Sequence, residues 1–174
     1  MTAKGKEGFR DRKGPDLSGM TVEELGEVFE SAEAPSVSDL SGDLRETVLA
    51  GPGALRLRRV RDIVNTPLNP WVGKRIKCTP PEGGRGSNIL SVGPKEVSVA
   101  EFEAYVGESV YDGDPAVVLD YDTGKNPAPV RRTVDEIRLT DHGRVIGAGR
   151  TEVSGKYRLL FYFTGRIKSP DGEG

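Results

Sequence analysis

Cysteine and histidine are almost absent from this 174-residue chain, which has one of each, Cys78 and His142. A single cysteine excludes an intramolecular disulfide and every zinc or iron–sulfur site that needs several cysteines. A single histidine excludes sites that need two or three imidazole ligands. We therefore expect no metal ion and no other cofactor.

Long apolar runs and an excess of positive charge are also missing. No apolar stretch approaches the roughly 18 residues of a membrane-spanning helix, and residues 1–17 show no apolar segment of the kind that a signal peptide needs. The chain has 25 Lys and Arg against 27 Asp and Glu, a net charge of −2, which argues against a generally basic nucleic-acid binder. We expect a cytoplasmic protein in a reducing compartment, with no nucleic acid as partner and no membrane span.

One helix is indicated near the N-terminus. Thr21 and Glu24 have the spacing of a capping box, and apolar residues from Val22 to Phe29 follow at helical intervals. The pattern predicts a helix over 22–31. Residues before it are polar and charged, so we expect a flexible tail at 1–17, one domain over 18–168 and a second tail at 169–174.

Short apolar runs separated by turn residues fill the rest of the chain. The expected strands cover 44–50, 71–78, 87–92, 96–111, 116–122, 130–139, 144–153 and 156–167, with a turn at 80–86. The alternation slips between Val99 and Phe102, which indicates a bulge. The segment 54–64 fits a helical stripe and strand alternation equally well. Such spacing predicts an antiparallel meander closed as a sandwich or a barrel.

Several of these stretches carry a resemblance to known proteins. They are Trp71-Val72-Gly73-Lys74, Ser87-Asn88-Ile89-Leu90, Asp112-Gly113-Asp114-Pro115-Ala116, Leu119-Asp120-Tyr121-Asp122, Val134-Asp135-Glu136-Ile137-Arg138 and Leu160-Phe161-Tyr162-Phe163. Over residues 40–167 the chain resembles bacterial lipocalin-like (calycin-type) β-barrel proteins, including the uncharacterised GXWXG/DUF4334 type. The resemblance implies a mainly β fold, an antiparallel lipocalin-like β-barrel with a short N-terminal helical region, that holds a small, largely apolar molecule. It implies no chemical reaction, because one fold hosts many functions.

The first functional hypothesis is the binding of a small hydrophobic ligand in the barrel cavity, with the segment 54–70 as a lid or rim. Aromatic side chains would form the wall, and arginine would anchor a carboxylate or carbonyl of the ligand through its planar fork of donors. The candidate ligand-binding residues are Trp71, Tyr105, Tyr121, Arg132, Arg138 and Phe161. Arg132 and Arg138 share one strand face with Glu136, and this face is either the inside of the barrel or a solvated outer face.

The second hypothesis is a cofactor-independent isomerase or cyclase that acts on a small apolar, polyketide- or terpenoid-like substrate in the same cavity. Asp120 or Glu136 would be the catalytic acid or base, and Tyr162 would donate a hydrogen bond. A carboxylate in an apolar cavity has a raised pKa, which suits this role. If the alternation places Asp120 and Glu136 outside the barrel, the enzyme hypothesis loses its residues.

A basic segment offers a third hypothesis, that of an interaction protein. Arg56, Arg58, Arg59 and Arg61 lie close together in the sequence and could meet RNA or an anionic lipid surface. Only 6% of the residues are aromatic, so stacking platforms for bases are scarce and a solvated charged face is the simpler interpretation.

The last expected strand is apolar on both faces, with Phe161 and Phe163 on one and Leu160 and Tyr162 on the other. A strand with one solvated face would alternate, so both faces should be covered. The cover is either the N-terminal helix, a second subunit in a homodimer, or the cavity.

Overall fold

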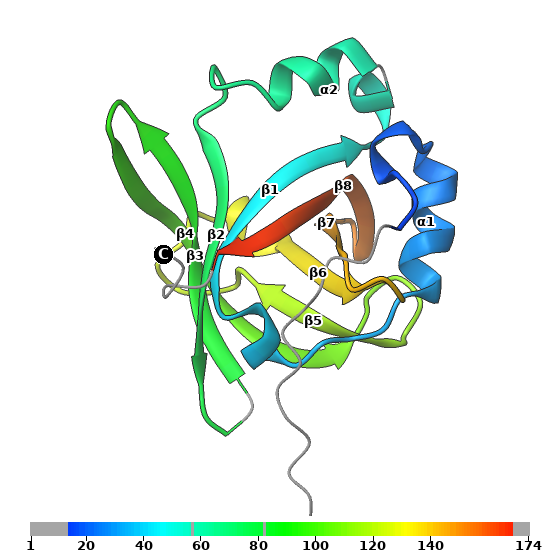
Figure 1. The fold of residues 1–174 in the computed structure, drawn as a ribbon. Helices are drawn as coiled ribbons and strands as arrows, with labels where there is room; N and C mark the ends of the chain where they lie inside the picture. Colours follow the sequence, from blue (N-terminus) through cyan, green and yellow to red (C-terminus); the bar gives the residue numbers. More distant parts are fainter. Residues whose placement is uncertain (1–13, 57, 82, 169–174) are drawn as a thin grey trace, which may run out of the picture.

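Alternating apolar residues, bounded by glycine and proline turns, form eight strands that close on themselves. The computed structural model describes residues 14–56, 58–81 and 83–168 (Figure 1). The strands are β1 (Gly42–Ala50), β2 (Trp71–Thr79), β3 (Gly83–Val92), β4 (Lys95–Glu108), β5 (Pro115–Asp120), β6 (Thr133–Leu139), β7 (Val145–Val153) and β8 (Lys156–Lys168). Each pairs antiparallel with the next, and β1 also pairs with β8. The expected antiparallel barrel is confirmed, and it is consistent with a lipocalin-like fold.

The bulge expected in the long fourth strand lies at Ala100. This residue has a φ of 51°, and the pairing of β3 with β4 shifts register between Ser87 and Asn88, opposite Glu101 and Val99. The extra residue restores the inward orientation of Phe102 and Ala104, which are both buried.

The third strand begins earlier than the sequence predicts. Residues 83–86 were expected to belong to a turn, but β3 starts at Gly83. A Cβ atom at Gly86 would collide with the carbonyl oxygen of Arg75 and with the ring of Phe102. The glycines therefore belong to the strand, where they allow a large aromatic ring to lie against the backbone.

Two other segments differ from the expected strands. Residues 130–132, expected as the start of a strand, form the 3-10 turn η4 (Val130–Arg132), because the preceding prolines lead the chain through a tight loop. The ambiguous segment is helical, with η3 (Gly53–Arg56) and α2 (Arg58–Val64). Across the described residues, no helix is long and apolar enough to cross a membrane.

The helix expected at 22–31 is α1 (Val22–Ser31), and it covers the outside of the barrel. Thr21 and Glu24 form both hydrogen bonds of the capping box. Phe29 packs against the ring of Tyr162 on β8, with ring centroids 6.2 Å apart. The doubly apolar last strand is thus covered by α1 at Tyr162 on its outside and by the core at Phe163 on its inside, whereas Leu160 on the outer face is 37% exposed, so the expected cover is only partial. The flexible tail expected at 1–17 is wrong at its end, because Leu17, in the turn η1 (Leu17–Gly19), is buried against this helix. Residues 1–13 of that tail and the second tail at 169–174 lie outside the described residues.

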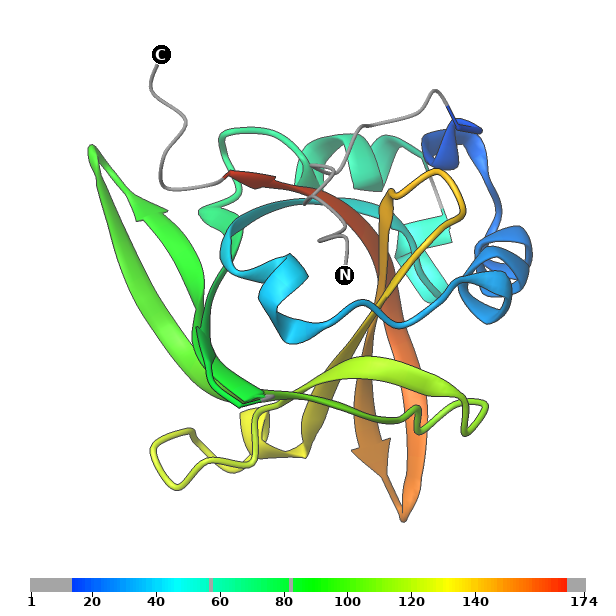
Figure 2. The same cartoon turned by 60° about the horizontal axis from the view of Figure 1, so that its bottom comes forward.

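A short turn, η2 (Val37–Leu40), closes one end of the barrel. Figure 2 shows η2, in light blue, lying across the ring of strands. Val37 and Leu40 are buried in one cluster with Leu44, Phe102 and other inward-facing side chains. This end of the barrel is therefore filled by an apolar core.

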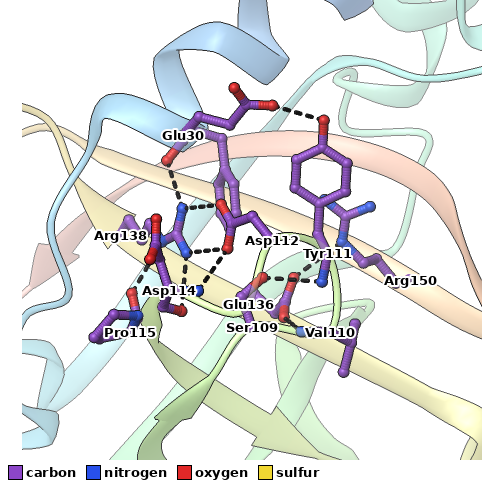
Figure 3. Close-up of polar contacts among 11 residues, drawn as sticks. Glu30, Ser109, Val110, Tyr111, Asp112, Asp114, Pro115, Glu136, Arg138 and Arg150 are labelled. Carbon is purple, nitrogen blue, oxygen red and sulfur yellow. Dashed lines mark hydrogen bonds and ion pairs between the residues drawn. The ribbon is translucent and has the colours of Figure 1, made fainter.

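A buried arginine on the outer wall holds α1 and the β4–β5 loop together (Figure 3). The guanidinium of Arg138 donates two hydrogen bonds of 2.7 Å to the carboxylate of Asp112. It also donates to the carbonyl oxygens of Phe29, Asp114 and Pro115 at 3.0 Å and lies 4.4 Å from the centre of the Phe29 ring. One side chain thus satisfies backbone groups from two separate segments.

We expect Arg138→Met to lower the free energy of unfolding by about 3 kcal/mol, because it leaves three carbonyl groups and a carboxylate without their charged donor. Arg75→Met is the matched control. Arg75 pairs with Asp43 on the surface and its side chain is 49% exposed, so we expect a loss below about 1 kcal/mol. Urea unfolding of both variants measures the difference, and equal losses would contradict this role of Arg138.

Candidate functional site

Above the apolar core, the barrel interior becomes polar. Three strands carry a charged residue on the inward face, two residues away from an apolar core residue. These pairs are Leu44 and Glu46 on β1, Ile76 and Lys74 on β2, and Ile137 and Asp135 on β6. Tyr121 follows Leu119 at the end of β5, and Asn88 faces inward from β3. We call Glu46, Lys74, Asn88, Tyr121 and Asp135 the interior cluster, and all five are buried.

Lys74 lies at the centre of the interior cluster. Its Nζ atom is 3.1 Å from the carboxylate oxygens of Glu46 and 2.9 Å from Oδ2 of Asp135. The ammonium group also lies 4.9 Å from the centre of the Trp71 ring and 5.1 Å from that of Phe163. The Trp71 indole donates a hydrogen bond of 3.0 Å to Oε2 of Glu46. Aromatic faces and two carboxylates therefore replace water around this cation.

Tyr121 joins the other side of the cluster. Its hydroxyl is 2.8 Å from Oδ2 of Asp135 and 2.8 Å from Oδ1 of Asn88. A phenol has a single hydrogen, so it donates to one of these oxygens at a time.

Burial shifts the pKa values of these groups. It raises the pKa of Glu46, an effect that the nearby charge of Asp135 reinforces and that of Lys74 opposes. For Lys74, burial alone would lower the pKa, but the charges of Asp135 and Glu46 outweigh it and hold the pKa above its usual range. Burial and the charge of Asp135 raise the pKa of Tyr121 well above its usual range. Lys74 is therefore a cation and Tyr121 a neutral phenol, while Glu46 gains a proton more easily than an exposed glutamate.

The cluster has more hydrogen-bond acceptors than donors. Among the described residues, Oε1 of Glu46 accepts no hydrogen bond, although the ammonium of Lys74 lies near it. The single hydrogen of Tyr121 serves two oxygens. Buried polar atoms nearly always accept or donate a hydrogen bond, so Oε1 of Glu46, which has only the ion pair with Lys74 at 3.1 Å, is a place where a further donor would be stabilised.

The barrel wall is interrupted beside this cluster. Residues 42–45 of β1 pair with 73–76 of β2, and in the part of the chain that the structure describes the pairing ends at Arg45 and Gly73. Beyond this point β1 and β2 diverge toward α2 (Figure 1). The side chain of Asn65 takes the place of a strand, since it accepts from the Val48 amide and donates to the Val48 carbonyl, both at 2.8 Å. Asn65, which follows α2, thus lies along the edge of β1 that β2 has left.

The structure brings three of the predicted ligand-binding residues to this place. Trp71 and Tyr121 contact the interior cluster, and half-buried Phe161 packs against the apolar core from inside. Tyr105 lies on the outer face of β4 and is 41% exposed, and Arg132 is exposed in η4. The six residues therefore do not form one site.

The three predicted catalytic residues lie outside the barrel. Asp120 is on the outer face of β5, where its carboxylate accepts from the amide of Asp122. Glu136 pairs with Arg150 at 2.9 Å, and Tyr162 packs beneath α1. None of the three contacts the interior cluster, because alternate residues of a strand point to opposite faces. The neighbouring residues Leu119, Ile137 and Phe163 are the ones that point inward from β5, β6 and β8.

The sequence allowed two positions for Glu136 and Arg138, the inside of the barrel or a solvated outer face, and the structure shows neither. Glu136 and Arg138 neither point inward nor meet solvent, since both are fully buried. Glu136 accepts from the amide of Val110 at 2.6 Å, and Tyr111 of the same loop covers Arg150, whose guanidinium lies 4.4 Å from the ring centre (Figure 3). The β4–β5 loop and α1 form this cover.

Sequence reasoning missed Glu46, Lys74, Asn88 and Asp135. The sequence contains a signal for three of them, since each charged residue lies two positions from an apolar residue and therefore on the same face of its strand. The pairs are Leu44-x-Glu46, Lys74-x-Ile76 and Asp135-x-Ile137. A charge on the inward face of a strand indicates a buried partner elsewhere.

Comparisons of this chain with protein-family models, with curated proteins and with solved structures find no match. The resemblance to GXWXG-type proteins therefore stays a prediction. Within the described residues, no group of three or more His, Cys, Asp and Glu side chains is placed to hold a metal ion.

The interior cluster predicts an asymmetry between two substitutions. Lys74→Met leaves two buried carboxylates without a cation, so we expect the free energy of unfolding to fall by about 3–5 kcal/mol. Glu46→Gln leaves Lys74 paired with Asp135 and keeps an oxygen for Trp71, so we expect a change below about 1 kcal/mol. Urea unfolding at neutral pH measures both, and a larger loss in Glu46→Gln than in Lys74→Met would contradict the charge assignment.

The raised pKa of Glu46 predicts a pH dependence. When a carboxyl group has a higher pKa in the folded than in the unfolded chain, the folded state binds the proton more tightly, and stability falls as the pH rises through that interval. We expect the wild type to lose stability relative to Glu46→Gln as the pH rises from the ordinary value of 4.5 through the raised pKa. Lys74 and Asp135 are present in both proteins, so the difference reports on Glu46. A difference that grows in the opposite direction would show that the fold favours the ionised carboxylate.

Proposed function

We propose that this protein binds a small, largely apolar molecule at the end of the barrel that the segment 53–70 borders. Eight-stranded barrels have an interior just wide enough to be filled by side chains or to hold one small ligand. Here η2 and the apolar core fill one end. The other end contains the interior cluster, together with the half-buried rings of Trp71 and Phe161. Apolar walls with a few placed polar groups are typical of ligand sites.

The observation that carries this proposal is the end of the β1–β2 pairing directly beside Trp71. Backbone groups in a barrel wall are normally paired strand to strand, whereas β1 at Val48 is paired by the side chain of Asn65. The two hydrogen bonds between Asn65 and Val48 are replaced by hydrogen bonds to water more easily than the many hydrogen bonds of a strand ladder. The edge of β1 at Val48 is therefore where a ligand would enter without disrupting a strand ladder.

The enzyme hypothesis finds less support. It named Asp120, Glu136 and Tyr162, which lie on the outer wall, so a reaction inside the barrel would not use them. The residues that would contact a ligand in the barrel are those of the interior cluster. Binding is thus the function that the geometry favours, and relationship to the lipocalin-like GXWXG type is part of the same proposal.

Trp71 is the only tryptophan of the chain, so its fluorescence reports on this end of the barrel. We expect the neutral probe N-phenyl-1-naphthylamine to bind with one-to-one stoichiometry and to quench Trp71 emission in a saturable way. Phe161→Leu, inside the barrel, should weaken binding several-fold through lost apolar contact. Native mass spectrometry of freshly purified protein would show any molecule retained from the host.

Tyr105→Leu is the control, because this aromatic residue lies on the outer wall. It should leave the probe affinity unchanged. Loss of binding in Tyr105→Leu with none in Phe161→Leu would place the probe on the outside and refute the proposed site. An absence of saturable binding by the wild type would refute the proposed function.

A further inference from the structure

We infer that the polar end of the ligand is a protonated amine held by Glu46. This inference rests on the proposed function, and it concerns the chemical class of the ligand. Three properties of the interior cluster support it: its charge, its excess of acceptors and the position of Glu46 beside the gap in the wall.

The charge of the cluster is unbalanced. Two buried carboxylates, Glu46 and Asp135, share the one ammonium group of Lys74. A buried negative charge without a partner is costly, so a second cation is favoured at this place. Burial, reinforced by the charge of Asp135, raises the pKa of Glu46, so a proton on Glu46 is favoured when no other cation is near.

The hydrogen-bond inventory points to the same ligand chemistry. Oε1 of Glu46 accepts no hydrogen bond in the described part of the chain, and Tyr121 has one hydrogen for two oxygens. An ammonium group brings three donors and no acceptor. A carboxylate ligand would bring a third negative charge and more acceptors, and a hydroxyl group would bring one donor and no charge.

Glu46 also lies next to the interruption of the wall. It follows Arg45, the last residue of β1 that pairs with β2, and its carboxylate contacts the indole of Trp71. An amine that passes between β1 and the segment 53–70 would meet Glu46 first. Trp71 and Phe161 would then contact the apolar part of the ligand.

Hexylamine, 1-hexanol and hexanoate provide a test, because they share one apolar chain and differ in the charged group. Calorimetry and Trp71 fluorescence at about pH 8, where an alkylamine with a pKa near 10 is protonated, compare their affinities. We expect hexylamine to bind about tenfold more tightly than hexanol, and hexanoate most weakly. Glu46→Gln, which should fold normally, is expected to abolish the preference for the amine.

Glu103→Gln is the matched control, since it removes one carboxylate from the exposed face of β4 and leaves the interior unchanged. The preference for hexylamine should persist in this variant. Equal binding of hexanol or hexanoate, or a preference that survives in Glu46→Gln, would overturn the inference. If N-phenyl-1-naphthylamine still binds inside the barrel in that case, the proposed function stands; if neither probe binds, both are wrong.

Discussion

A closed barrel excludes water from its interior, so every charge placed there needs a partner. Lys74 meets this constraint by reaching from β2 to Glu46 on β1 and to Asp135 on β6, while Tyr121 links Asp135 to Asn88 on β3. Side chains from several walls of the barrel thus meet in one cluster. Lys74 is the cation that contacts both Glu46 and Asp135, so the hydrogen bonds and ion pairs of the whole cluster depend on its presence.

The same constraint applies on the outside of β6. Asp135 faces inward, whereas its neighbours Glu136 and Arg138 face outward and are nevertheless fully buried. Their partners, Arg150 and Asp112, come from β7 and from the β4–β5 loop. This outer set fastens α1 and the loop to the barrel wall (Figure 3). Charged residues on both faces of one strand therefore serve different purposes: outside, they attach covering segments, and inside, they leave a surplus of negative charge.

Local patterns in the sequence were sufficient for the strands, the capped helix and the bulge at Ala100. Alternation and capping act over a few residues, which a sequence shows directly. Whether the charged residues of a strand point into the barrel or out of it depends on partners far away in the chain. Arg138 and Asp112, for example, are 26 residues apart. For this reason Glu136 and Arg138 were expected inside or solvated, and Glu46 and Lys74 were overlooked. The strand start at Gly83 was missed because the glycine-rich stretch looks like a turn, whereas Gly86 makes room for the ring of Phe102 on β4.

A single glycine stands at the point where the pairing of β1 with β2 ends. Gly73 has a φ of 147°, a conformation that favours glycine, and a Cβ atom there would collide with the carbonyl oxygen of Leu44. The backbone of β2 therefore turns against β1 at the last pair and separates from it afterwards. Unpaired strand edges need another partner, and Asn65 supplies one for Val48. The glycine that lets the two strands approach so closely thus stands at their last pair. This point lies beside Glu46, whose Oε1 atom accepts no hydrogen bond within the described residues and has only its ion pair with Lys74.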